Sequence, residues 1–252
     1  MIRTKLGLLG LCAVVLGMMA MSAGSAQGAT TLFSWLILNA AKTVATDLLA
    51  LLTGKTDSTH LTLDGEVAGL KIAVTCTNFT LKGVHLVPGG KLNETGKVVF
   101  TGCKVYKVAP LTEEYKCTVK TVGAAAGTVE TNAGKGELVL HEVKAGVKEV
   151  LTKVEPLTGL EGNFATLRFE GAECVLPELN QVHGTLYLKD CLGFATTHKL
   201  EHLVEQGPLT SLYVGGHSAK QLEITRILGS AWISLTGEHA GRDWSAMDVV
   251  HP

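Results

Sequence analysis

The sequence predicts a mainly β protein with an antiparallel sandwich or barrel-like fold, and three observations predict it. After residue 58, short segments that alternate in polarity or are rich in β-branched residues are separated by glycine-containing turns. Aromatic residues make up 5% of the 252 residues while glycine occurs 29 times, which suits short strands and tight turns. The alternation of strands and helices that is typical of a parallel sheet is not seen in these segments.

The chain begins with the organisation of a secretory signal peptide, which we assign to residues 1–28. Arg3 and Lys5 precede an uncharged apolar run over 6–21, and small residues follow, with cleavage expected after Ala26 or at the end of the assigned range. We therefore expect a secreted or cell-surface protein in a compartment where disulfides persist, with retention in a periplasm as the alternative.

Residues 30–54 are expected to form one amphipathic helix after the signal peptide. Apolar residues recur at helical spacing through 32–52. Lys42 and Asp47 fall in the middle of this segment, and their charges argue against a transmembrane span in the mature chain. The helix is expected to pack on the β core, with a surface-lying or oligomer-forming helix as the alternative.

The rest of the chain is divided into a first β half over 58–155 and a second over 156–252. The division is placed near Pro156, at the most linker-like stretch of the chain. The segments 96–103 and 184–191 are weakly similar, which two related halves would explain, and one continuous fold is the alternative. The expected strands are 60–64, 70–76, 79–82, 97–101, 115–120, 128–131, 137–141, 147–151, 164–169, 184–190, 222–225 and 232–236.

Five cysteines follow the predicted cleavage site, so at least one of them is unpaired within a monomer. The similarity of the halves predicts the disulfides Cys76–Cys103 and Cys174–Cys191 and leaves Cys117 as the odd cysteine. A disulfide between Cys103 and Cys117 across a hairpin is the alternative. The odd cysteine is expected to be a buried, inert thiol, with an intermolecular disulfide or a reactive thiol as the alternatives.

Trp35-Leu36 in the expected helix, an aliphatic strand that ends at Cys76, and further cysteines at strand ends define a general plan. This plan resembles that of uncharacterised secreted β-rich proteins of bacteria. The resemblance implies export and β structure, and it implies no activity.

A short motif introduces a second hypothesis, a secreted zinc-dependent hydrolase. His198, Glu201 and His202 match the H-x-x-E-H signature of inverted zinc proteases. On a helix the two histidines lie one turn apart and could bind zinc, with the glutamate as general base. A chain with nine histidines matches so short a motif by chance with some frequency, and the proteases that carry it are larger α/β proteins. The preferred interpretation is a solvated helix face or connector, so no catalytic residue, metal ligand or cofactor is assigned.

Charge and composition narrow the expected function. The formal net charge is -1 without a basic cluster, which argues against nucleic acid as a partner and against polybasic binding to membranes. We expect an exported, non-catalytic structural or interaction protein of the bacterial cell surface, which associates with itself or with other cell-surface components. A small-ligand-binding β-barrel is a third hypothesis, and it requires an apolar cavity.

Overall fold

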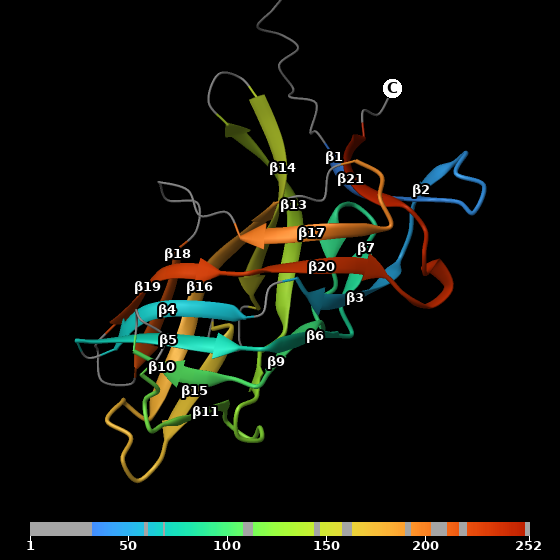
Figure 1. Ribbon diagram of the computed structural model, residues 1–252. Coiled ribbons are helices and arrows are strands. Elements are labelled where there is room, and N and C mark those ends of the chain that lie inside the picture. Colours follow the sequence, from blue (N-terminus) through green and yellow to red (C-terminus); the bar gives the residue numbers. More distant parts are fainter. Residues whose placement is uncertain are drawn as a thin grey trace, which may run out of the picture. The chain divides into compact units, whose positions relative to one another are not determined.

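Strands make up most of the part of the chain that the computed structural model describes (Figure 1). That part comprises residues 32–57, 60–67, 69–107, 113–143, 147–157, 163–189, 193–202, 211–216 and 221–249. The predicted signal peptide lies outside these residues. The strand pairings are antiparallel, and the prediction of a mainly β, antiparallel fold is confirmed.

One set of strands closes into a ring. In hydrogen-bonded order its members are β16 (Leu179–Lys189), β14 (Val147–Pro156), β13 (Gly134–Val143), β8 (Lys91–Leu92), β7 (His85–Val87), β3 (Ala50–Thr56), β20 (Ser230–Leu235) and β17 (Thr197–His202). The last member pairs back to the first, because β17 also hydrogen-bonds β16 through His202 and Leu188. The long hairpin of β13 and β14 is visible in Figure 1.

A second set of strands continues from the other half of β16. On one side follow β18 (Ser211–Gly216), β19 (Gln221–Leu228), β4 (Leu61–Val67), β5 (Leu70–Cys76) and β10 (Lys104–Tyr106). On the other side follow β15 (Ala165–Glu170) and β11 (Thr118–Thr121). β16 is therefore shared, since its residues 179–185 pair with β15 and β18 and its residues 186–189 pair with β14 and β17.

Two small sheets and one short helix complete the described elements. The first sheet has the order β2 (Ala45–Asp47), β1 (Leu32–Leu38), β21 (Trp244–Val249), and the second has the order β12 (Val129–Glu130), β9 (Lys97–Thr101), β6 (Asn78–Lys82). A 3-10 helix, η2, spans Gly237–His239.

Two clusters of buried apolar side chains form the core. One contains Trp35, Phe79 and Ile233, together with other residues of β1, β3, β7, β13, β20 and β21. The other contains Val105, Val119 and Phe169 and belongs to the second set of strands. Each cluster therefore stabilises one of the two sets of strands through burial of apolar area.

The prediction of an amphipathic helix over 30–54 is wrong, because this segment forms the strands β1, β2 and β3. In β1 the alternate residues Phe33, Trp35 and Ile37 are buried, which is a strand period. Asn39 then starts a tight turn, because its side chain accepts a hydrogen bond from the Thr43 backbone N–H at 2.9 Å. The apolar residues of this segment fit both the helical and the strand period. The segment forms strands because β1 pairs with β21 and β3 pairs with β20.

Strand pairing also crosses the expected division at Pro156. This proline ends β14, where it lies opposite Gly134 of β13. β3 pairs with β20 and β4 pairs with β19, so that chain from before and after Pro156 shares the same sheet. Residues 33–249 form one compact unit.

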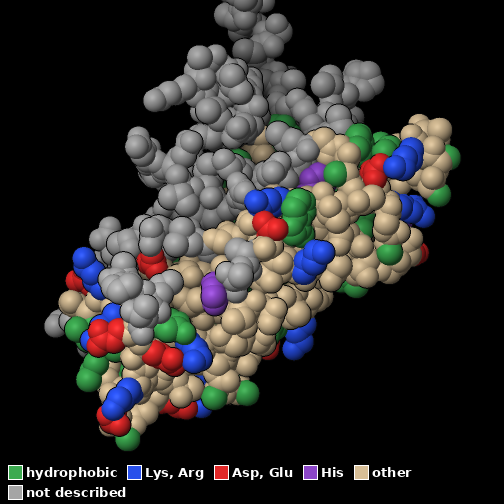
Figure 2. All heavy atoms as spheres, in the orientation of Figure 1, with side chains coloured by type: hydrophobic (Ala, Val, Ile, Leu, Met, Phe, Trp, Pro, Cys, Tyr) green, Lys and Arg blue, Asp and Glu red, His purple; other side chains and the backbone are tan. Residues whose placement is uncertain are grey.

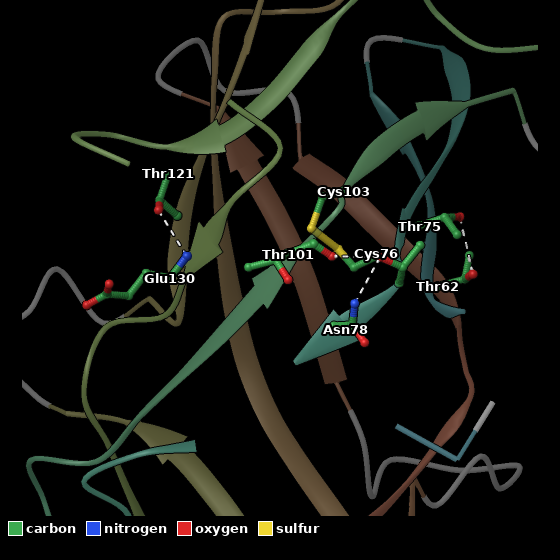
Figure 3. Close-up of a disulfide and its surroundings, with 9 residues drawn as sticks. Thr62, Thr75, Cys76, Asn78, Thr101, Cys103, Thr121 and Glu130 are labelled. Carbon is green, nitrogen blue, oxygen red and sulfur yellow. Dashed lines mark hydrogen bonds between the residues drawn. A yellow bond between two sulfur atoms is a disulfide. The ribbon is translucent and has the colours of Figure 1, made fainter. Parts of the chain in front are cut away.

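One disulfide joins Cys76, the last residue of β5, to Cys103, which lies between β9 and β10 (Figure 3). The register of β5 and β10 brings the two together, because Thr75 lies opposite Lys104. The predicted pairing of these two cysteines is confirmed.

The second disulfide joins Cys117 to Cys174, and this corrects the predicted pairing of Cys174 with Cys191 and the assignment of Cys117 as the odd cysteine. Cys117 directly precedes β11, and Cys174 follows β15. These strands pair antiparallel with Thr118 opposite Glu170, so that the two cysteines meet at the same end of the pair. Cys191 lies outside the described residues.

Candidate functional site

An apolar cavity of about 400 Å³ is lined by residues of both core clusters. Trp35, Phe79 and Ile233 contribute from one cluster, and Val74 and Leu167 contribute from the other. Protein interiors are close-packed and contain few voids larger than a water molecule. A space of this volume lies within the range of roughly 300–1,000 Å³ that is typical of sites for small molecules. The cavity is therefore the candidate site.

The strand period explains why one face of several strands lines the cavity. Leu186 and Leu188 of β16 are two residues apart and lie opposite Val154 and Thr152 of β14, so that all four side chains share one face of the sheet. Several small residues also line the cavity. These are Gly96, Gly134, Ala165, Gly229 and Ala231.

Most of the polar groups that line the cavity are held by the protein itself. The side chain of Asn93 accepts a hydrogen bond from the His85 backbone N–H at 2.7 Å and donates to the Gly83 carbonyl oxygen at 2.7 Å. Asn132 donates its amide to the carbonyl oxygen of Asn163 at 3.0 Å. These hydrogen bonds join Asn93 to the start of β7 and Asn132 to the segment before β15, and the cavity surface that remains is mainly aliphatic and aromatic.

A smaller pocket of about 160 Å³ adjoins the cavity, since Leu92 and Lys135 line both spaces. Its other lining residues are mostly charged and comprise Lys91, Glu94, Gly136, Glu137, Lys153 and Glu155. The numbers of lysines and glutamates are equal, in line with the mixture of both charges on the face shown in Figure 2.

Ion pairs order the charged pocket. The Lys153 ammonium lies 3.0 Å from the Glu155 carboxylate and 3.8 Å from that of Glu137, whereas Lys135 lies 3.8 Å from Glu155. The hydrogen bond from Lys153 to Glu155 raises the pKa of Lys153. Burial has the largest single effect and raises the pKa of Glu155. The hydrogen bond and charge of Lys153, the charge of Lys135 and the hydrogen bond from Thr185 together outweigh it and lower that pKa. Glu155 is therefore paired mainly with Lys153.

The structure places the H-x-x-E-H motif on a strand, β17, and not on a helix. His198 is buried, and its Nε2 lies 2.7 Å from the Trp244 carbonyl oxygen, which can only accept, so that Nε2 carries the proton. Residues four apart on a strand, such as His198 and His202, are separated by about 13 Å along the chain. The helical geometry that zinc binding by His198, Glu201 and His202 requires is therefore absent from β17.

Within the described ranges, no group of three or more histidine, cysteine, aspartate or glutamate side chains is placed to hold a metal ion. The sequence did not predict this cavity. Its alternating strands indicate which side chains turn inward, but they carry no signal of how completely those side chains fill the space between them.

None of the helices among the described residues is long and apolar enough to span a membrane. The chain was also compared with known proteins. No known protein family matches it, and no curated protein or solved structure shows significant similarity to it.

Proposed function

We propose that this chain is an exported, non-catalytic interaction protein that binds a small apolar molecule in the cavity. The observation that carries the proposal is an apolar space of about 400 Å³, which lies at the junction of the two core clusters. Filling it removes apolar surface of the ligand and of the protein from water, and each Å² removed contributes roughly 25 cal/mol to binding.

Two features support the exported part of the proposal. The organisation of residues 1–28 is that of a signal peptide. The disulfides Cys76–Cys103 and Cys117–Cys174 suit an oxidising compartment.

Replacing Ala231 by phenylalanine is expected to abolish binding of an apolar probe. Ala231 lies on β20 and lines the cavity, so a phenyl ring at this position takes up space that the ligand needs. We expect the affinity for the neutral fluorophore N-phenylnaphthylamine to fall by more than about tenfold, since 1.4 kcal/mol of lost contact gives this factor. Tryptophan fluorescence gives a second measurement, because Trp35 and Trp244 line the cavity.

Ala126→Phe is the matched control, because Ala126 is exposed in the turn after β11 and does not line the cavity. Val154→Phe on β14 also fills the cavity and provides an independent test if Ala231→Phe folds poorly. Thermal unfolding establishes that each variant folds. If the wild-type protein does not bind the probe, or if the two filling variants bind it as the wild type does, the proposal is wrong.

Self-association at the cell surface is a second candidate function, favoured by the edge strand β2. This strand lies at the end of its sheet, and the residues that flank it, Val44 and Leu49, have side chains that are 55% and 57% exposed. An open strand edge beside apolar side chains can pair with the same edge of a second copy.

Native mass spectrometry over a range of concentrations tests this second candidate. We expect a dimer that Val44→Asp converts to a monomer, because a buried, unpaired carboxylate opposes pairing of the two edges. Val122→Asp is the control, since Val122 is 59% exposed but lies in the turn after β11. A wild-type protein that stays monomeric at every concentration rejects self-association and leaves ligand binding untouched.

A further inference from the structure

The side chain of Thr152 brings a hydroxyl group into the apolar wall of the cavity. Thr152 lies on β14, lines the cavity and is 5% exposed. Its cross-strand neighbours are Leu138 of β13 and Leu188 of β16. Val150 and Val154 are the next residues of β14 on the same face of the sheet. The side chains that flank this hydroxyl on the sheet are therefore aliphatic and offer it no hydrogen-bond partner.

The other threonines that line the cavity use their hydroxyl groups within the protein. The hydroxyl of Thr62 lies 3.2 Å from that of Thr75, and the two share a hydrogen bond (Figure 3). Thr131 accepts a hydrogen bond from the Val98 backbone N–H at 2.9 Å. In the part of the chain that the structure describes, the hydroxyl of Thr152 has no such partner.

The hydroxyl of Thr152 is open to the cavity. The Nε1 of Trp244 also lacks a hydrogen-bond partner among the described residues, but it is enclosed by protein atoms. The Oγ1 of Thr152 is not enclosed in this way, and the free space beside it is the cavity that Thr152 lines. A buried hydroxyl without a partner destabilises a protein, and a ligand that hydrogen-bonds it removes this cost.

The charge of the ligand follows from the same wall. Of the residues that line the cavity, all of which the structure describes, Lys135 alone is ionisable. Lys135 lies opposite Glu155, whereas its neighbour Gly136 lies opposite Val154, so the Lys135 side chain is on the face of the sheet away from the cavity. A charged group that enters the cavity would lose its water without gaining a counter-ion, which is costly.

We propose that the ligand is a neutral, largely aliphatic molecule with one hydroxyl or carbonyl oxygen that hydrogen-bonds the Thr152 hydroxyl, an inference that rests on the proposed function. Its aliphatic part contacts the apolar wall of the cavity. A carbonyl oxygen accepts from the threonine hydroxyl, whereas a ligand hydroxyl can donate to it or accept from it.

The test compares 2-decanone and decanol with decane, measured by displacement of N-phenylnaphthylamine from wild-type and variant proteins. Thr152→Val replaces the hydroxyl by a methyl group. It is expected to weaken binding of 2-decanone and decanol about three- to tenfold relative to decane, the factor that one neutral hydrogen bond gives. Thr152→Ser retains the hydroxyl and should retain the preference for the two oxygen-containing ligands over decane.

Thermal unfolding without ligand is an independent measurement on the same variant. Thr152→Val should melt no lower than the wild type, because it removes a buried hydroxyl that has no partner. A lower melting temperature would show that a protein group holds this hydroxyl, and the inference would be wrong.

Thr62→Val is the matched control, because Thr62 lines the same cavity but its hydroxyl is paired with that of Thr75. It should leave the preference for 2-decanone over decane unchanged. Decanoate and decyltrimethylammonium should both bind more weakly than decanol. Tighter binding of either charged molecule would contradict the neutral character of the ligand.

Two results separate failure of this inference from failure of the proposed function. If decane and the fluorophore bind while Thr152→Val leaves the relative affinities of 2-decanone, decanol and decane unchanged, the cavity binds apolar molecules and the inference about the oxygen is wrong. If none of these molecules binds to the wild-type protein, the proposed function itself fails.

Discussion

Replacing Cys117 and Cys174 together by alanine is expected to lower the free energy of unfolding by about 4 kcal/mol, because their disulfide closes a loop with a sequence separation of 57. The bond restricts the unfolded chain, and it also joins the start of β11 to the segment that follows β15. Cys117 is buried in the second core cluster, so the variant loses packing there as well.

Thermal unfolding measures this loss, and the melting temperature should fall by roughly 10 °C. The double variant of Cys76 and Cys103 is the control, and a smaller fall is expected from its sequence separation of 27. Peptide mapping without reduction tests the pairing itself. A peptide that joins Cys174 to Cys191 would contradict the structure and restore the pairing suggested by the similarity of the two halves.

Replacing Trp35 by alanine is expected to cost about 3–5 kcal/mol of the free energy of unfolding. Trp35 is 1% exposed, and its ring centroid lies 5.8 Å from that of Trp244. Its indole N–H donates to the Lys91 carbonyl oxygen at 3.1 Å, which links β1 to β8. The substitution therefore removes a large buried ring and a hydrogen bond at the same time.

Leu36→Ala is the matched control for Trp35→Ala. Leu36 is the next residue of β1, lies opposite Asp47 of β2 and is half-buried. On a strand the two side chains point to opposite faces, and we expect the control to cost roughly 1 kcal/mol. Denaturant unfolding measures both values. Similar losses for the two variants would contradict the strand period that the structure shows for this segment.

The two disulfides show which cysteine pairing the sequence predicts and which it does not. Cys76 and Cys103 are at the ends of strands that pattern and turn residues predict well, and β5 and β9 correspond to the predicted strands 70–76 and 97–101. The pairing of Cys117 depends on β11 lying beside β15, strands that are far apart in the sequence. Neither periodicity nor spacing carries that information, and the similarity of the halves favoured the wrong partner for Cys174.

The segment with Trp35 shows the limit of periodicity. Its apolar residues satisfy helical spacing, while Phe33, Trp35 and Ile37 also satisfy alternation. The turn at Asn39 and the neighbouring strand β21 resolve the ambiguity. Similarly, His198 fits a helical metal motif in the sequence, but its strand and its hydrogen bond to Trp244 give it a place in the core.

By itself the sequence determined the β class and most of the strands, because these depend on local alternation and turn chemistry. It predicted the disulfide Cys76–Cys103 but left Cys103–Cys117 as an alternative. The tertiary structure alone decided the shared strand β16, the ring that closes through β17, and the cavity between the two core clusters. These depend on which strands, distant in the sequence, pair with one another. A cavity is a property of packing between side chains, and no local pattern of residues records it.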